Sequence, residues 1–461
     1  MRCLMIPQIV GYEVAAKSDY YSHYSIMRAV SEMEPSYFYM WLASMQKSGM
    51  KSVSGLSYFF EDSVHGFIPQ MATATGRVME FFNWQRGLYP TDCVFTSRAG
   101  LAPALAVGLG DLAGRAMPVV ITEPRVYWIG SEASHNVVAY YDTVLRAAGY
   151  ATCLAIYWSK WEKKEALDAA SLLLASSALK HADDFGFVVN PLVDSKRVSG
   201  PLSGARKRLL FAGRLNENKR YKEILEAYGK VLMARRNDVE VWVHSGTGAY
   251  SKLIPSDSRW HRTSEKLSRE EYGQLLSSSH VGAYLSRDEG ANITVLEMIL
   301  SGMVLALPKR PWVEKLFYPE VYPFMTVDKE LPAMLDWLLD NYEDAWRQLE
   351  PIRDMIVERN SWPAFKSKVM NVIEAVRAYP RVPPFHVFKK VVLQTMEHQA
   401  RRNLSFDVVL QSTDMWRHWL IYAVARSAYA CYQAVRDMDD LSSAVPTLVA
   451  RDEDFVWLEK Q

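Results

Sequence analysis

Two glutamates, Glu289 and Glu297, stand eight positions apart and are the side chains best suited to chemistry in this chain. A small, glycine-containing turn follows the first glutamate. An apolar helical pattern then begins, with Asn292 or Thr294 as its N-cap. Amides at a helix start have no intrahelical acceptor and favour an anion. Carboxylates that accept hydrogen bonds from hydroxyls, beside amides that take a phosphate, suit a sugar nucleotide.

Two cations, Arg214 and Lys219, form a second motif upstream. The apolar run Leu209–Ala212 predicts a short buried strand, and Gly213 predicts a turn at its end. Both cations would therefore follow the carboxyl end of a strand, the edge at which open α/β sheets bind ligands. Paired cations there can neutralise a departing diphosphate, which is the main electrostatic demand of glycosyl transfer.

Strand patterns alternate with amphipathic helix patterns along most of the chain, which predicts α/β architecture with doubly wound parallel sheets. The first series contains the expected strands Leu4–Val10, Ser36–Leu42, Val94–Thr96, Val119–Thr122 and Thr152–Tyr157, and the helices Tyr24–Glu32, Met71–Phe82, Leu101–Leu112, Val137–Ala148 and Lys163–Ser176. The second series contains the strands Leu209–Ala212, Val239–His244, Val281–Leu285 and Val304–Leu307, and the helices Tyr221–Arg235, Arg269–Ser278 and Ile293–Leu300.

A length of 461 residues exceeds one ordinary core, so we expect two domains and an appendage. A polar stretch rich in Gly, Pro and Ser at 199–204 separates the two series. We expect an N-terminal domain over 1–200, a second domain over 201–378, and a helical extension over 379–461 that packs back on the first.

Composition narrows the class of protein. A hydrophobic share of 49% and a charged share of 23% are typical of a folded globular protein. Because the net charge is +1, the protein as a whole has no strong electrostatic attraction to nucleic acid or acidic lipid. The four cysteines are scattered, which argues against a disulfide framework or a zinc site and favours a reducing compartment. With no signal peptide or membrane-spanning pattern evident, we expect a cytoplasmic protein.

The two motifs together, G-R-L-x(3)-K and then E-x(7)-E, resemble those of the family 4 glycosyltransferases, a group of retaining enzymes with the GT-B fold. The segment Ser301–Ala306 also resembles that family, and the resemblance is specific over about 205–310. It implies two Rossmann-like domains facing a cleft, with a nucleotide-sugar donor mainly on the second domain and the acceptor mainly on the first. It also implies a reaction that needs no metal and no cofactor, since the nucleotide sugar is a co-substrate.

The resemblance assigns roles to individual residues. Arg214 and Lys219 would hold the diphosphate, Glu289 would contact the transferred sugar, and Glu297 would bind the ribose hydroxyls. The remaining donor-side positions are the backbone cradle Gly290, Ala291, Asn292, Ile293 and Thr294, and the nucleotide-side residues Gly213, His244, Gly246 and Thr263.

The N-terminal series departs from the family, because it lacks the glycine-rich loop after its first strand and a certain counterpart of the acceptor-side histidine. Glu123, His65 and Arg98 are the acceptor-side candidates, with His135 as a further histidine. An isolated histidine is more often structural than catalytic. The divergence suggests an unusual acceptor.

The C-terminal extension is basic and aromatic in its first part, where 381–436 hold eight Lys or Arg against three Asp or Glu. One interpretation is a helical pair packed on the first domain, with the aromatic residues as core. The other is a surface for a polyanionic acceptor, because cations meet phosphates and aromatic rings stack on exposed bases.

Three functional hypotheses follow. The acceptor is a saccharide, a lipid-linked sugar or a small metabolite, or else a hydroxymethylated base in DNA, as for viral enzymes that act in the host cytoplasm. The third hypothesis is an inactive GT-B protein that serves as a binding scaffold. The presence of Arg214, Lys219, Glu289 and Glu297 together argues against the third.

Overall fold

In the computed structural model, the chain forms two compact units. One unit contains Met1–Val189 and the chain from Lys366 onward, and the other contains Asn190–Phe365. Both junctions lie earlier than the sequence-based boundaries after 200 and 378. The structure describes residues 1–6, 18–42, 56–60, 92–97, 102, 106, 117–122, 153–171, 176–193, 197–203, 206–213, 215, 219–234, 238–245, 255–263, 267–287 and 292–379. Apart from Tyr379, the expected extension lies outside these ranges.

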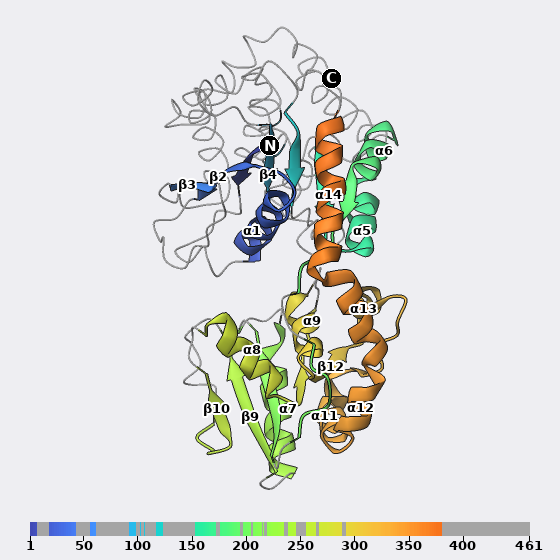
Figure 1. The fold of residues 1–461 in the computed structure, drawn as a ribbon. Helices are drawn as coiled ribbons and strands as arrows, with labels where there is room; N and C mark the ends of the chain where they lie inside the picture. Colours follow the sequence, from blue (N-terminus) through green and yellow to red (C-terminus); the bar gives the residue numbers. More distant parts are fainter. Residues whose placement is uncertain are drawn as a thin grey trace, which may run out of the picture. The chain divides into compact units, whose positions relative to one another are not determined.

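The first unit is built on a seven-stranded parallel sheet with the order β3-β2-β1-β4-β5-β6-β7 (Figure 1). Its strands are β1 (Arg2–Ile6), β2 (Tyr37–Leu42), β3 (Leu56–Phe60), β4 (Cys93–Thr96), β5 (Val119–Ile121), β6 (Leu154–Tyr157) and β7 (Gly186–Val188). Every residue of β4, β5 and β6 is buried, as expected for parallel strands covered on both faces.

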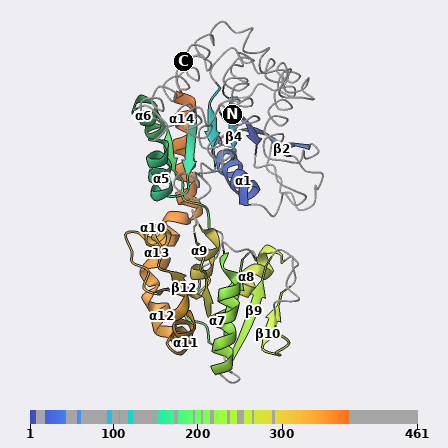
Figure 2. The same cartoon turned by 180° about the vertical axis from the view of Figure 1, so that it is seen from behind.

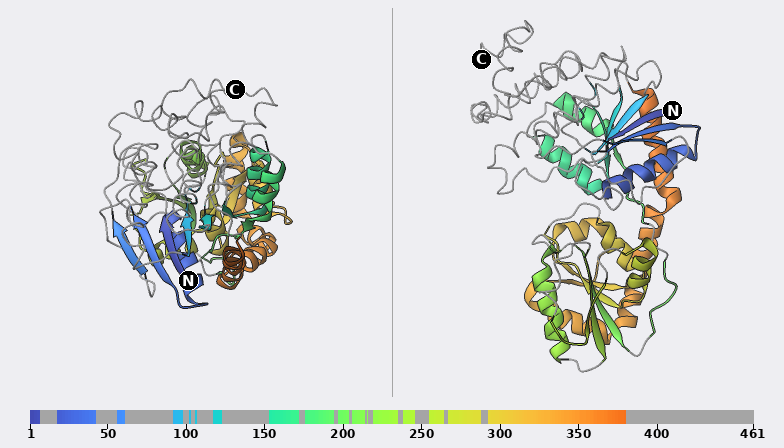
Figure 3. Two further views of the ribbon diagram at one scale, coloured as in Figure 1. Left: turned by 90° about the horizontal axis from the view of Figure 1, so that it is seen from above. Right: turned by 90° about the vertical axis from the view of Figure 1, so that its left-hand side faces the viewer.

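The helices described in the first unit are α1 (Ser18–Ser31), α5 (Lys160–Ala170), α6 (Ser176–Asp184) and the later part of α14 (Trp362–Ala378). Helix α14 returns the chain to this unit, as the orange helix in Figures 1 and 3 shows. Lys366 Nζ lies 3.1 Å from a carboxylate oxygen of Glu32, and Arg377 pairs with Glu34. The chain thus crosses back to the first unit before residue 379.

The second unit contains a six-stranded sheet with the order β10-β9-β8-β11-β12-β13 (Figure 2). Its strands are β8 (Lys207–Ala212), β9 (Val239–His244), β10 (Trp260–Arg262), β11 (Val281–Ala283), β12 (Val304–Pro308) and β13 (Met325–Thr326). All neighbouring strands run parallel. Numbered within the unit, the order is 3-2-1-4-5-6, which is that of a dinucleotide-binding sheet.

Helices cover both faces of the second sheet. They are α7 (Tyr221–Ala234), α8 (Arg269–Ser277), α9 (Ile293–Leu300), α10 (Pro311–Phe317), α11 (Leu331–Asp340), α12 (Tyr342–Gln348) and α13 (Glu350–Asn360). Because the β8–β9 and β11–β12 crossovers run in opposite directions, their helices lie on opposite faces. Helix α7 packs beside α11, and α8 packs beside α9 (Figures 1 and 2).

A glycine is required at the centre of this sheet. A Cβ atom at Gly282 in β11 would lie 2.9 Å from the backbone oxygen of Leu210 and 3.0 Å from the side chain of Met303. Since β8 and β11 are adjacent, a side chain at this position would push on the neighbouring strand. Glycine at this position therefore allows β8 and β11 to lie side by side, and the predicted motifs follow the carboxyl ends of these two strands.

Candidate active site

The predicted donor-side residues that the structure describes lie at one edge of the second sheet. Strands β8 and β11 are adjacent, and the chain leaves them in opposite directions across the sheet. The carboxyl ends of such a pair form the crevice in which open α/β sheets bind ligands. Gly213 directly follows β8, and Tyr284 directly follows β11.

Lys219 lies at this crevice. Its Nζ atom donates to the Tyr284 hydroxyl at 2.5 Å and lies 4.8 Å from the centroid of that ring. Tyr284 is buried, so it holds the ammonium at the edge between the two strands. Of the two predicted cations, Lys219 is therefore at the switch point, and Arg214 lies outside the described residues.

The first turn of α9 supplies hydrogen-bond donors at the same edge. Asn292 is its N-cap, with φ 32°, and its Oδ1 accepts from the Val295 amide at 3.3 Å. Thr294 lies inside the helix, so the cap is Asn292. The amides of Ile293 and Thr294 have no acceptor among the residues that the structure describes. Within the described residues, the helix start thus offers amide donors that have no acceptor, together with the positive end of a dipole.

Glu297 lies one turn inside α9 and is only 5% exposed. Arg269, the first residue of α8, donates from Nη2 to Glu297 Oε1. A capping box fixes the start of α8, because the Glu271 amide donates to Ser268 Oγ at 3.1 Å and the Ser268 amide donates to Glu271 Oε2 at 2.7 Å. The order Ser268, Arg269, Glu270, Glu271 is typical of such a box, but the sequence gives no signal that Arg269 faces Glu297.

A hydrogen-bonded group at the ends of β9 and β10 completes the site. His244 Nδ1 lies 2.7 Å from Thr263 Oγ1, and the His244 ring centroid lies 5.5 Å from that of Tyr272. Burial lowers the pKa of His244, so its ring is neutral at pH 7. Burial, and then the charge of Glu297, raises the pKa of Tyr272, so its hydroxyl stays protonated. These side chains offer neutral donors and acceptors beside a carboxylate.

The arrangement suits a ligand with an anionic centre and hydroxyl groups at one end. Lys219 and the α9 start can hold the anion, and Glu297 can accept hydrogen bonds from hydroxyls. The predicted residues outside the described ranges are Arg214, Gly246, Glu289, Gly290 and Ala291 on the donor side, and His65, Arg98 and Glu123 on the acceptor side. Within the described part of the chain, no three His, Cys, Asp or Glu side chains could hold a metal ion. No described helix is long and apolar enough to cross a membrane.

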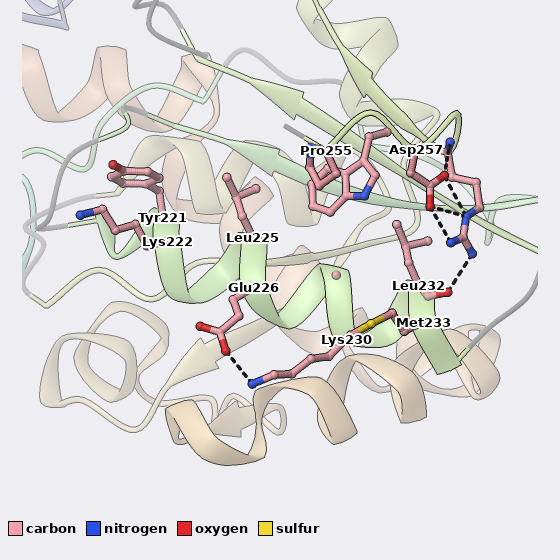
Figure 4. Close-up of a pocket in the computed structure, with 12 residues that line it drawn as sticks. Tyr221, Lys222, Leu225, Glu226, Lys230, Leu232, Met233, Pro255 and Asp257 are labelled. Carbon is pink, nitrogen blue, oxygen red and sulfur yellow. Dashed lines mark hydrogen bonds and ion pairs between the residues drawn. The ribbon is translucent and has the colours of Figure 1, made fainter. Parts of the chain in front are cut away.

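A separate groove of about 670 Å³ runs along α7 (Figure 4). Leu225 and Leu232 of α7 line it opposite Pro255, and two ion pairs, Glu226–Lys230 and Asp257–Arg259, flank it. None of the predicted site residues lines this groove. Four of its charged side chains form these two ion pairs, and the fifth, Lys222, lies over the ring of Tyr221.

Comparisons with known proteins match the fold but not a sequence family. No family model and no curated protein matches the chain. Among solved structures, HepE of Anabaena in complex with UDP-glucose is 11% identical over 81% of this chain and all of the other, with a TM-score of 0.57. Sucrose-phosphate synthase of Thermosynechococcus elongatus is 11% identical over 82% of this chain and all of the other, with a TM-score of 0.61.

A third similar structure shows that the likeness extends to a protein with a different assigned activity. A Listeria monocytogenes protein provisionally named UDP-N-acetylglucosamine 2-epimerase is 12% identical over 83% of this chain and 98% of the other, with a TM-score of 0.52. Similarity at such low identity establishes architecture, whereas the reaction must be argued from the site. The chain forms two Rossmann-like parallel sheets, one after the other in the sequence. Together with the similar solved structures, this arrangement shows that the chain has the GT-B fold.

Proposed function

We propose that the chain is a glycosyltransferase that takes a sugar from a nucleotide-sugar donor bound at the carboxyl edge of the second sheet. The observation that carries this proposal is the buried Glu297 one turn inside α9, the helix whose amide end opens at the edge where Lys219 lies. The complex of HepE with UDP-glucose supports a nucleotide sugar as the donor class.

Each side chain has a role in this proposal. Lys219 and Arg214 compensate the charge of the diphosphate, and the first turn of α9 binds its oxygens. Glu297 accepts hydrogen bonds from the ribose hydroxyls, and His244 and Thr263 line the nucleoside end. Glu289 contacts the transferred sugar. The assignments for Arg214 and Glu289 rest on the sequence motifs.

The proposed reaction proceeds with retention and without a metal, as in the family 4 enzymes that the motifs resemble. The bond between the anomeric carbon and the diphosphate oxygen breaks, and the acceptor oxygen bonds to that carbon on the same face. The acceptor proton passes to the departing phosphate oxygen, so no strong side-chain base is needed. Lys219 and the α9 dipole stabilise the charge that develops on the leaving group.

Removal of either central side chain tests the donor site. In Lys219→Ala we expect the affinity for the donor to fall about tenfold or more, because a charge-assisted contact is lost. Glu297→Ala should weaken donor binding to a similar degree. Isothermal titration with a panel of nucleotide sugars would measure both. Lys222→Ala is the matched control, since Lys222 is exposed and lies three positions from Lys219. Unchanged binding and turnover in both site variants would disprove the site assignment.

Two acceptor classes remain in this proposal: a saccharide, lipid-linked or small-molecule hydroxyl, and a hydroxymethylated pyrimidine in DNA. The divergent N-terminal series and the basic, aromatic sequence of 381–436 favour DNA, and the net charge of +1 argues against it. An enzyme acting on DNA must expose the base to reach it.

Labelled donors decide between the acceptor classes. Nucleotide sugars would be incubated with DNA carrying hydroxymethylated pyrimidines, with ordinary DNA, and with no acceptor. Label in the modified DNA alone would identify a DNA glycosyltransferase and its donor. Slow donor hydrolysis without label in any DNA would point to the other acceptor class. If neither transfer nor hydrolysis occurred with any donor, the scaffold hypothesis would be favoured.

A further inference from the structure

The side chain of Asn292 has two polar ends in different situations. Its Oδ1 accepts from the Val295 amide, which requires an oxygen at that position and so determines the orientation of the amide group. Its Nδ2 is then the end that points away from the cap. Asn292 is 7% exposed, and Nδ2 has no hydrogen-bond partner among the described residues.

A buried amide nitrogen without an acceptor is costly and calls for an explanation. Because Asn292 folds over the first turn of α9, Nδ2 lies at the same helix end as the amides of Ile293 and Thr294. These three groups can only donate. Together with the positive end of the helix dipole they select an acceptor-rich anion rather than a hydroxyl, which would bring a proton of its own.

We infer that Asn292 is a diphosphate-binding residue, whose Nδ2 donates to a phosphate oxygen of the bound nucleotide. The inference rests on the proposed function and adds to it a side-chain contact at the α9 start. One asparagine then performs two tasks: Oδ1 caps the start of the helix, and Nδ2 donates a hydrogen bond to the ligand. The left-handed backbone at φ 32° suits this residue, because asparagine adopts that conformation more readily than most others.

Two substitutions separate the tasks. Asn292→Asp keeps an oxygen for the cap and replaces the donor by a negative charge. Asn292→Gly fits the left-handed backbone and removes both the donor and the cap oxygen without adding charge, and glycine is itself an accepted N-cap residue. We expect the Kd for the nucleoside diphosphate to rise about tenfold or more in the glycine variant, and further in the aspartate variant, because a hydrogen bond to an anion is lost. The Kd for the matching nucleoside should stay unchanged.

The experiment uses the full chain and isothermal titration. UDP, GDP and ADP are tested on the wild type, and the tightest binder and its nucleoside are carried forward to the variants. Asn341→Asp is the matched control, because Asn341 lies at the junction of α11 and α12, away from the predicted site residues. Thermal unfolding of each variant verifies that the chain is folded.

The outcomes distinguish the inference from the proposed function. If the wild type binds no nucleoside diphosphate, the donor site itself is wrong. If the wild type binds but both folded variants bind equally well, the donor site stands and the role of Asn292 is wrong. A loss in the aspartate variant alone would reflect charge repulsion and would also overturn the hydrogen bond. A loss for the diphosphate in both variants, with the nucleoside unaffected, would support it.

Discussion

At the scale of single residues, the pairing of Arg269 with Glu297 is the main electrostatic feature of the candidate site. The carboxylate is almost completely buried, and a buried charge needs a partner. Arg269 provides it from 28 positions away while keeping about half of its own side chain in solvent. The pair holds α8 and α9 together at the edge where the donor is proposed to bind.

Arg269→Met should lower the free energy of unfolding by about 1 to 2 kcal/mol, because Glu297 would keep its buried charge without this partner. The value is smaller than for a fully buried pair, since water screens the half-exposed guanidinium. Adding Glu297→Gln should recover part of the loss by removing the charge. Urea unfolding at pH 7 would measure the effect, with Arg310→Met as an exposed control. A loss equal to that of the control would contradict the role of the pair.

At the scale of elements, His280 joins the amino ends of β8 and β11. Its amide donates to the Arg208 carbonyl, and its Nδ1 accepts from the Arg208 amide at 3.2 Å. The ring packs edge-on against Tyr342, 5.0 Å away. Burial, and then the charges of Lys207 and Arg208, lowers the pKa of His280 to about 4. The neutral ring is therefore part of the folded sheet.

This lowered pKa predicts a pH-dependent stability. Between the pKa of about 4 in the folded state and the ordinary value of 6.5, the unfolded chain binds more protons, so stability falls as pH falls through that window. The contribution is about 3 kcal/mol at most. His280→Asn keeps an acceptor near Arg208 but does not titrate. Unfolding at pH 7 and pH 4.5 should show a smaller loss in this variant, and equal losses would contradict the prediction.

At the scale of the whole molecule, the chain enters and leaves the second unit at one place. The Val193 amide donates to the Asn360 carbonyl at 3.1 Å, and Asn360 Nδ2 donates to the Pro191 carbonyl at 2.7 Å. The sheet and its covering helices lie between these points in the sequence. Helix α14 then continues from this unit into the other.

A chain of residues 190–365 should therefore fold by itself and unfold in one cooperative thermal transition. A shorter chain of 190–349, which lacks α13, should not fold, because Ile352, Arg353 and Ile356 are buried. Circular dichroism during heating would compare the two. Similar transitions in both, or the absence of a transition in the longer chain, would contradict the closure of this unit.

Features that depend on local interactions could be predicted from the amino-acid sequence. Alternating strand and helix patterns predicted two parallel sheets, and the cap residues predicted the starts of α8 and α9, because capping and periodicity involve neighbours along the chain. The very short strands β7, β10 and β13 escaped prediction, because two or three residues carry no periodic signal. The helix expected at Lys163–Ser176 instead ends at Ala170, and α6 begins at Ser176.

The contacts between side chains that are distant in the sequence could not be predicted in this way, because they depend on the tertiary structure. Lys219 and Tyr284 are 65 positions apart and touch because β8 and β11 became neighbours in the sheet. Arg269 reaches Glu297 because α8 packs beside α9, which no spacing along the chain specifies. Such contacts depend on strand order and helix packing, which are properties of the whole fold. Glu297 and Lys219 could be identified from the sequence, whereas their partners, Arg269 and Tyr284, could be identified only from the fold.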